Sequence, residues 1–310
     1  MVKKLRIILI LIIVVMTSMT VQAKKVELKY NLEKGQEFFV SHTLNQELAQ
    51  EFMGQSLVMD NLMITKYKFK VLEVKADGNF LIEQKVIAKK IVMENDVLNL
   101  NYDTESGEDA PAVIEYYTKI LNIPFSFLIS PQGEIIEMVG TDKYIETIQE
   151  SLGTIAGPEQ QLIAGLAAQS TSDEGLKGQV GAIFFKYPQG KTKLRSSWSD
   201  ESESTLMVKF KNSIENTLVE VGKEKASIKQ TVKIDQLEME GEEVQGMTMN
   251  YELSGKKQGG YEVDVKTGLL LKADAVTEIS GVISVESPQL ASPMSMPMTI
   301  KMTETLVQIK

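Results

Sequence analysis

The sequence predicts an α+β protein in which two antiparallel, β-rich halves are related by an internal repeat and a central helical segment packs on the sheets. The repeat is the first observation, because residues 71–94 return as residues 218–240. Both copies read as strand, polar turn and strand with alternating apolar residues. Three positions on one face recur without a gap: Ile82, Gln84 and Val86 as Ile228, Gln230 and Val232. The second observation is the helical spacing of apolar residues between the halves.

Residues 1–23 have the features of a secretory signal peptide. A basic start precedes the unbroken apolar run Ile7–Met16, and small residues lead up to Ala23. A membrane-anchoring helix is the alternative, but the run is shorter than the roughly 20 residues that span a bilayer. We expect cleavage after Ala23 and an exported chain, periplasmic or extracellular, that is soluble and has no membrane span.

Composition excludes several classes of function. The chain has no cysteine, which rules out disulfides, thiolate metal sites and cysteine nucleophiles. Its formal charge is −9, and removal of the three basic residues of the signal peptide leaves −12. Nucleic acid is therefore not an expected partner, because binding to phosphate backbones requires a basic surface.

Residues 24–140 are expected to form the first β-rich half. Alternation predicts strands over 26–32 and 38–44, joined as a hairpin by the turn at 33–36. After the first copy of the repeat, Pro111 favours a short helix to Leu121. A second hairpin is predicted over 125–139, with its counterpart in the other half at 261–273.

Residues 141–186 are expected to form the helical segment. One helix follows a Thr141 cap, a second starts at Pro158, and a third runs from a Ser172 cap towards Phe185. These helices are expected to lie across a sheet face.

Residues 187–205 are interpreted as a polar connection, and residues 206–310 as the second β-rich half. In the last segment, methionines and Ile300 alternate with polar residues. Pro297 lies on the polar side and lacks an N–H donor, which indicates a sheet edge or a bulge.

Four short motifs resemble a family of exported bacterial proteins, found mainly in Bacteroidetes, that carry a domain of unknown function. They are Tyr30-x-Leu32-x-x-Gly35, Ser130-Pro131-x-Gly133, Pro188 with Ser197-Trp198, and Gly260-x-x-x-Asp264-x-x-Thr267-Gly268-Leu269. The family usually has Gly-Asp before the tryptophan, where this chain has Arg195-Ser196. The resemblance implies no activity and no functional residues. The pattern also resembles periplasmic lipoprotein-carrier folds, in which a curved sheet wraps over helices and shelters an acyl chain.

No catalytic residue, cofactor or metal site is expected, and the chain is not expected to be an enzyme. His42 is the only histidine and shares a strand face with apolar residues, so a hydrogen-bonded structural role is favoured over general-base catalysis. No nucleophile motif accompanies it. One histidine without cysteine disfavours a zinc or iron site. A pair of carboxylates acting as in glycosidases stays open, because sequence does not give their separation.

Two groups of residues are candidates for contact with a ligand. Gln84 and Gln230 each lie between apolar residues on a strand face, so each needs a hydrogen-bond partner, either structural or in a ligand cavity. The methionines Met247, Met249, Met294, Met296 and Met298 form flexible apolar faces. Copper(I) at the last three is the sharper alternative, but the period of two explains their spacing without a metal.

These observations favour a non-enzymatic carrier of lipid or another apolar ligand in the cell envelope. The ligand is expected between a sheet and the helices of residues 142–185. The alternative is a structural or protein-interaction module that binds another envelope protein and no small molecule. An apolar concavity distinguishes the carrier from the module.

Overall fold

The computed structural model describes residues 25–310 except for 53–54, 95–98, 112–113, 154–166, 168–170, 207, 238–241, 245–246 and 288–291. The expected signal peptide and the helix expected from Pro158 lie outside the described residues and stay predictions.

The described elements are strands with three helices. In chain order they are β1 (Lys25–Glu27), β2 (Glu37–Phe52), β3 (Gln55–Val74), β4 (Phe80–Glu94), β5 (Asn99–Asp103), α2 (Tyr116–Lys119), β6 (Phe125–Ile129), β7 (Ile135–Val139), α3 (Asp142–Gly153), α5 (Asp173–Ile183), β8 (Lys191–Lys193), β9 (Ser197–Thr205), β10 (Lys209–Val221), β11 (Lys225–Gln236), β12 (Glu242–Val244), β13 (Met247–Asp264), β14 (Leu270–Glu286) and β15 (Met294–Ile309).

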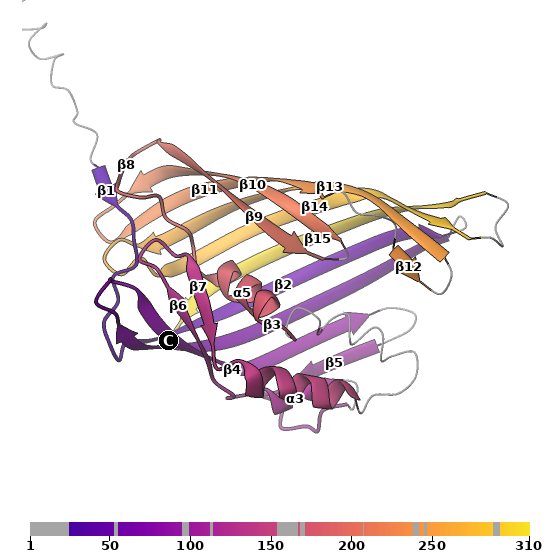
Figure 1. Cartoon of the computed structure of the whole chain (residues 1–310), viewed down its shortest axis with the longest axis horizontal. Coiled ribbons are helices and arrows are strands. Elements are labelled where there is room, and N and C mark those ends of the chain that lie inside the picture. Colours follow the sequence, from indigo (N-terminus) through magenta and orange to yellow (C-terminus); the bar gives the residue numbers. More distant parts are fainter. Residues whose placement is uncertain are drawn as a thin grey trace, which may run out of the picture.

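A single antiparallel sheet of 13 strands dominates the molecule, and the helices lie against one of its faces, which we call the inner face (Figure 1). The expected α+β class is wrong, because strands make up 63% of the structure and helices 12%. The helices α3 and α5 have 12 and 11 residues, whereas β3 has 20 and β13 has 18. The helical segment is thus an addition to one continuous sheet.

Strand order confirms the internal repeat at the level of topology. The first half runs β7-β6-β4-β3-β2 across the sheet, and the second half runs β14-β13-β11-β10-β9 in the same sense. Ile82 pairs with Val71 as Ile228 pairs with Leu218. In both hairpins the register also shifts directly after that pair. A further register shift occurs at equivalent positions in the pairing of β6 with β7 and of β13 with β14. Register, bulges and strand order therefore repeat together.

Strand β15 joins the two halves. It pairs with β14 over Met294–Val307 and with β2 over Met298–Ile309. Pro297 pairs with Val282 on the β14 side and lies just beyond the stretch paired with β2. Its missing N–H therefore falls where β15 is locally an edge, as the sequence indicates.

The N-terminal hairpin expected from residues 26–44 does not form. β1 has three residues and pairs with β8, whereas β2 pairs with β3 and β15. Leu28, Tyr30 and Leu32 are buried as the alternation indicates, but the backbone N–H of Tyr30 donates to Pro131 of the β6–β7 turn. Alternation identifies the buried face of this segment but does not specify the strand with which it pairs.

The region expected as a polar connection, residues 187–205, contains β8 and β9, and β9 is an edge strand of the sheet. The helix expected over 111–121 is reduced to α2. The α5 helix agrees with its prediction, since Ser172 caps it by accepting from the N–H of Gly175. In the described part of the chain, no helix combines the length and the apolar character needed to cross a membrane.

Phe184, directly after α5, lies at the centre of a cluster that we call the aromatic core. Its ring is 5.2–6.2 Å from the rings of four aromatic residues: Tyr30, Phe38, Phe69 and Phe127. Side chains of α3 and α5, including Ile148, Leu176 and Val180, are buried in the same cluster. The helices therefore cover the inner face at this end of the sheet.

Candidate functional site

The inner face carries a second apolar cluster beyond the aromatic core. Along β14, Ala273 belongs to the aromatic core, whereas Ile279, Ile283 and Val285 belong to the second cluster, and their shared parity places them on one face. We call this second group the methionine-rich cluster: Val208, Phe210, Val232, Ile234, Leu253, Ile279, Ile283, Val285, Met296, Met298 and Ile300. The described helices contribute no residue to it.

Four of the five methionines named as candidates meet in this cluster. Met296 and Met298 are buried, and Met249 and Met294 pack against it half-buried. The Met249 sulfur accepts from the Tyr251 hydroxyl at 3.8 Å. The fifth, Met247, begins β13, but its side chain lies outside the described part. The methionines thus line one wall of the inner face.

The two glutamines occupy equivalent positions but are not in equivalent surroundings. Gln230 donates to Asn216 and accepts from the Tyr261 hydroxyl, both at 2.9 Å. Gln84 is buried among the described residues, and its Oε1 has no hydrogen-bond partner there. Phe127 pairs with Ile82 as Tyr261 pairs with Ile228, so the position of Tyr261 is held in the first half by a phenylalanine, which has no hydroxyl to donate. The repeat therefore positions both amides and satisfies only one of them fully.

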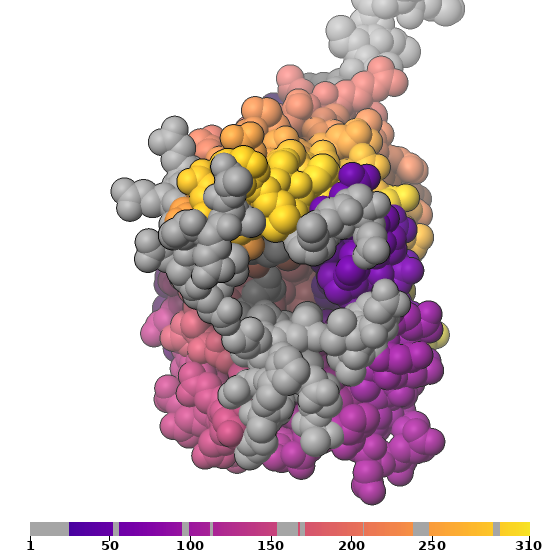
Figure 2. All heavy atoms as spheres, turned by 90° about the vertical axis from the view of Figure 1, so that its right-hand side faces the viewer, coloured from indigo at the N-terminus to yellow at the C-terminus, as the bar shows by residue number. Residues whose placement is uncertain are grey.

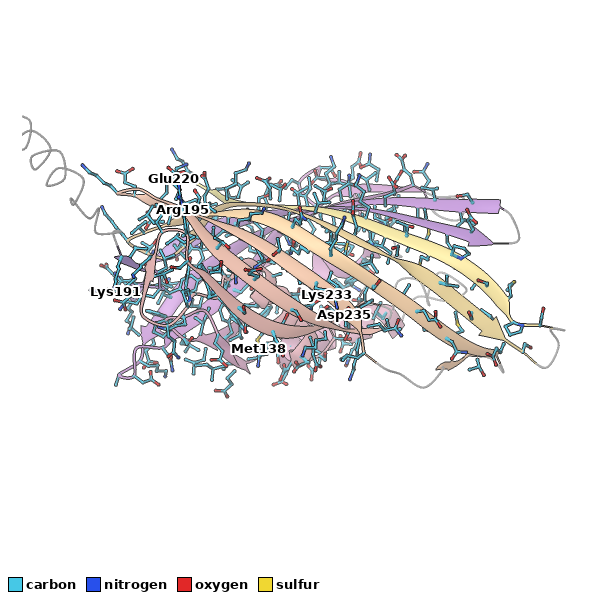
Figure 3. The ribbon with its side chains drawn as sticks, turned by 90° about the horizontal axis from the view of Figure 1, so that it is seen from above. Met138, Lys191, Arg195, Glu220, Lys233 and Asp235 are labelled. Atoms are coloured by element: carbon cyan, nitrogen blue, oxygen red, sulfur yellow. The ribbon has the colours of Figure 1, made fainter. Side chains whose placement is uncertain are left out.

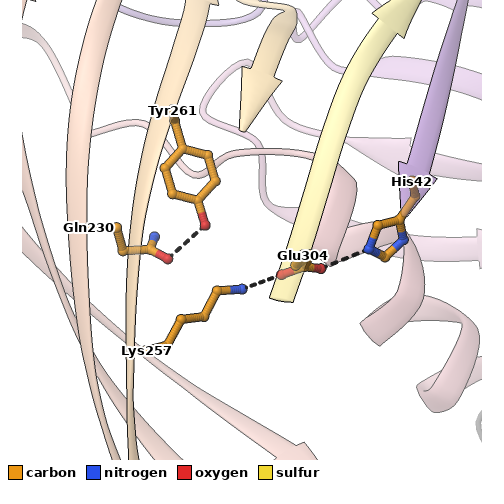
Figure 4. A network of polar contacts seen from close by, with 5 residues as sticks. All are labelled: His42, Gln230, Lys257, Tyr261 and Glu304. Carbon is orange, nitrogen blue, oxygen red and sulfur yellow. Dashed lines mark hydrogen bonds and ion pairs between the residues drawn. The ribbon is translucent and has the colours of Figure 1, made fainter. Parts of the chain in front are cut away.

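A charged network lies beside Gln230 on the inner face (Figure 4). Glu304 of β15 contacts His42 Nε2 through one oxygen at 2.9 Å and Lys257 Nζ through the other at 2.7 Å. All three side chains are at most a quarter exposed. Both carboxylate oxygens are occupied, so the contacts hold Glu304 in place on the sheet.

The partners of Glu304 decide its charge. Burial alone raises the pKa of this carboxyl, but the hydrogen bond with His42 and the positive charge of Lys257 outweigh it and lower the pKa to about 2. For Lys257, burial lowers the pKa, and the charge of Glu304 more than offsets this, so the net shift is upward. The network is therefore an ion pair at neutral pH.

Small residues on β13 and β14 leave room for the Lys257 side chain to reach Glu304. The two strands β13 and β15 are separated by β14, and Ala275 of β14 lies directly opposite both Glu304 and Gly259. A Cβ at Gly259 would stand 3.0 Å from the Ala275 side chain. Sequence reasoning did not single out Lys257 or Glu304. Their place on otherwise apolar strand faces is the signal that marks them.

Between the two clusters, β2, β3 and β15 expose apolar side chains on the inner face. We call them the apolar strip: Leu44, Leu48, Leu57, Met59, Met63 and Met302. Leu57 is 38% exposed and the others are half-buried. Seen from the far end of the strands, the molecule is hollowed between the C-terminal strands above and the N-terminal strands at the side (Figure 2). Apolar side chains thus remain accessible on a concave face.

The outer face has a different character. A cavity of about 460 Å³ lies over β9, β10, β11 and β13. On each of these strands two outward side chains flank an inward one, and the outward ones are polar: Ser199, Glu201, Ser213, Glu215, Thr231, Lys233, Lys256 and Gln258. Lys233 forms an ion pair with Asp235 at 2.8 Å, and both residues are labelled in Figure 3. This polar groove holds none of the candidate residues.

The described residues contain no group of three or more histidine, aspartate or glutamate side chains arranged to hold a metal ion. Among known proteins, no curated protein matches the sequence. A structure of lipovitellin described for its lipid–protein interactions is similar over 90% of this chain and 26% of its own, at 9% identity and a TM-score of 0.45. The chain thus spans about a quarter of lipovitellin.

Two structures from Pseudomonas, one of them described as an outer-membrane channel, are also similar. A channel of Pseudomonas putida F1 matches 90% of this chain and 97% of its own, at 7% identity and a TM-score of 0.26. OccK11 of Pseudomonas aeruginosa matches 91% and 100%, at 7% identity and a TM-score of 0.18. At these scores none of the three likenesses carries a functional argument. A family model does match residues 77–270, more than half of the sequence, and the chain therefore belongs to DUF6263, a family of unknown function.

Proposed function

We propose that this protein binds lipid or another apolar ligand on the inner face of its sheet and carries it without catalysing a reaction. The observation that supports this most directly is the apolar strip. Leu57 and Met59 stay accessible on the same concave face that elsewhere buries the aromatic core. Accessible apolar side chains in a concavity are the usual feature of sites for apolar ligands.

The energetics favour such a ligand. Each buried methylene contributes about 0.8 kcal/mol, so an acyl chain along the strip is held without specific polar contacts. Methionine is suited to this wall, because its flexible thioether adapts to chains of different shape. Met59, Met63 and Met302 are half-buried in the strip, and the methionine-rich cluster continues the wall beyond it.

The interaction module is less well supported. Apart from Leu57, the exposed large apolar side chains of the described residues are distributed over several strands and loops: Val58 and Val74 on β3, Ile136 and Val139 on β7, Leu194 and Leu206 between strands, Val219 on β10 and Val276 on β14. Scattered single apolar residues are normal for protein surfaces and do not form a docking patch.

A matched pair of variants tests the proposal. Met59 and Val58 are neighbours on β3 that point to opposite faces. Binding of the neutral fluorescent probe N-phenyl-1-naphthylamine should weaken at least about tenfold in Met59→Asp, because a carboxylate next to an apolar chain must be desolvated. Val58→Asp should bind like the wild type. Equal binding by all three proteins, or none by the wild type, would reject the inner face as the site.

Native mass spectrometry of protein purified without detergent is the second arm. Bound mass that organic extraction removes supports a resident apolar ligand. A protein that carries no bound ligand and does not bind the fluorescent probe would favour the interaction module instead.

A further inference from the structure

Lys89 lies on the inner face, as Lys257 does, but its neighbours are different. The register of β3 and β4 shifts between Lys66 and Tyr67, and beyond the shift Lys89 lies opposite the buried Thr65. Its side chain is half-buried. Its Nζ lies 3.8 Å from the Met63 sulfur and 4.0 Å from the centre of the Tyr117 ring. Lys89 therefore reaches the apolar strip from the neighbouring strand.

No carboxylate pairs with Lys89 in the described part of the chain, whereas Lys257 on the same face is paired with Glu304. A thioether is a weak acceptor, and a ring face compensates only part of the lost hydration of an ammonium group. Burial lowers the pKa of Lys89 to about 8, so most of the side chains are still protonated at neutral pH. An unpaired, partly desolvated cation is a ready site for an anion.

Asn61 is an independent second observation at the same place. It lies two residues from Met63 on the same face of β3, and its buried Oδ1 has no hydrogen-bond partner among the described residues. A buried acceptor of this kind gains from a donor, such as a hydroxyl of a bound molecule. An unpaired cation and an unpaired acceptor thus flank Met63 of the apolar strip.

We propose that Lys89 and Asn61 form a head-group subsite, and that the ligand is an anionic lipid whose head group also carries a hydroxyl. The negative oxygens lie against Lys89, the hydroxyl donates to Asn61, and the acyl chain follows the apolar strip. This inference rests on the proposed function and adds the charge class of its ligand. The outer-face Lys85 of the same strand is unsuited to this role, because it already pairs with Glu83 at 3.3 Å and points away from the strip.

The test compares three single-chain probes of equal acyl length by calorimetric titration below their micelle concentrations. They are lysophosphatidylglycerol, which is anionic with free hydroxyls, zwitterionic lysophosphatidylcholine, and uncharged monoacylglycerol. The wild type should bind the anionic probe at least about tenfold more tightly than the uncharged one, which corresponds to about 1.4 kcal/mol. Glycerol phosphate, which has no acyl chain, should not compete.

Variants assign the preference to the subsite. Lys89→Met should lose the tenfold preference and keep the affinity for monoacylglycerol, and Lys89→Arg should retain the preference. Asn61→Leu should weaken lysophosphatidylglycerol, whose head-group glycerol carries two further hydroxyls, more than lysophosphatidylcholine, whose choline head group carries none. Lys85→Met, on the outer side of the same strand, is the matched control. Thermal melts of each variant check its folding.

The outcomes separate the two proposals. Equal wild-type affinity for all three probes, unchanged in Lys89→Met, would overturn the head-group subsite and leave apolar binding intact. No binding of any probe would overturn the proposed function itself. Tight competition by glycerol phosphate would show an anion site independent of lipid and would also reject the inference.

Discussion

Gln230 occupies in the second half of the sheet the position that Gln84 occupies in the first, yet Tyr261 donates to Gln230 while the counterpart of Tyr261 in the first half is Phe127, which has no hydroxyl. Both halves contain the glutamine, but only the second half supplies a tyrosine hydroxyl that donates to it. This difference makes the two glutamines an internal comparison of a satisfied and an unsatisfied buried amide.

We expect Gln230→Leu to lower the free energy of unfolding by about 2–3 kcal/mol, because it leaves the buried Asn216 and the Tyr261 hydroxyl without their shared partner. Gln84→Leu should change it by less than about 1 kcal/mol, or stabilise the protein, because an unpaired Oε1 is removed. Urea unfolding of both variants measures the difference. Equal losses in the two would contradict the assignment.

Removal of the Glu304 charge should destabilise the fold. In Glu304→Gln, Lys257 stays partly buried without its counter-ion, and we expect a loss of about 2–4 kcal/mol at neutral pH. Lys257→Met combined with Glu304→Gln should recover part of this loss, since no charge is then left unpaired. If the double variant is no more stable than the single one, the pair is not coupled.

The same residue predicts an acid dependence. The folded-state pKa of Glu304 is lowered from 4.5 to about 2. Its stabilisation, about 2–3 kcal/mol, is therefore complete above pH 4.5 and is lost as the pH falls through about 2. The gap in stability between wild type and Glu304→Gln should close over this window. A gap that is constant from neutral pH to pH 2 would contradict the ion pair.

Lys89 predicts a second pH dependence, in the alkaline range. Its pKa is lowered from 10.5 to about 8, so between these values the unfolded chain holds the proton more tightly and stability rises with pH. Lys89→Met should be more stable than the wild type at neutral pH by about 1–2 kcal/mol, because a partly buried, unpaired charge is removed. This advantage should shrink as the pH approaches 10.5. Tyr117, which faces Lys89, is present in both proteins, so the difference between them reports Lys89 alone.

Two glycines in neighbouring strands test how closely the sheet is packed. A Cβ at Gly281 of β14 would meet the backbone carbonyl of Glu252 on β13, whereas a Cβ at Gly260 meets nothing within 4 Å. Gly281→Ala should lower the free energy of unfolding by about 2–3 kcal/mol, and Gly260→Ala should change it by less than about 0.5 kcal/mol. Chemical denaturation compares them directly.

The repeat was predictable because its signal is local: Ile82 and Ile228 sit in similar strand–turn–strand sequences. The helix cap at Ser172 was predictable for the same reason. The partner of β1 was not, because alternation shows which face is buried and says nothing about which distant strand pairs. β9 could not be predicted because, apart from Trp198, its residues are polar on both faces, as suits an exposed edge strand.

Some features of the candidate site could likewise be predicted from the sequence, and others could not. The apolar faces that contain Met296 and Met298 follow from alternation along one strand. The contact of His42 with Glu304 joins residues 262 positions apart, and it exists because β15 lies beside β2. No pattern within either strand specifies that neighbour. The unpaired state of Lys89 is likewise visible only once its surroundings are assembled.

The position of β15 sets the order of events during folding. β2 lies near the start of the described chain, and its β15 partner includes Ile309. The first half therefore presents an open edge along β2 until the residues of β15, as far as Ile309, have been synthesised. Such long-range closure is slow, because a large loop must be ordered before the pairing stabilises it. A chain that emerges from a ribosome should thus complete this sheet only once β15 has emerged, and a chaperone that shields the β2 edge would have to stay bound until then.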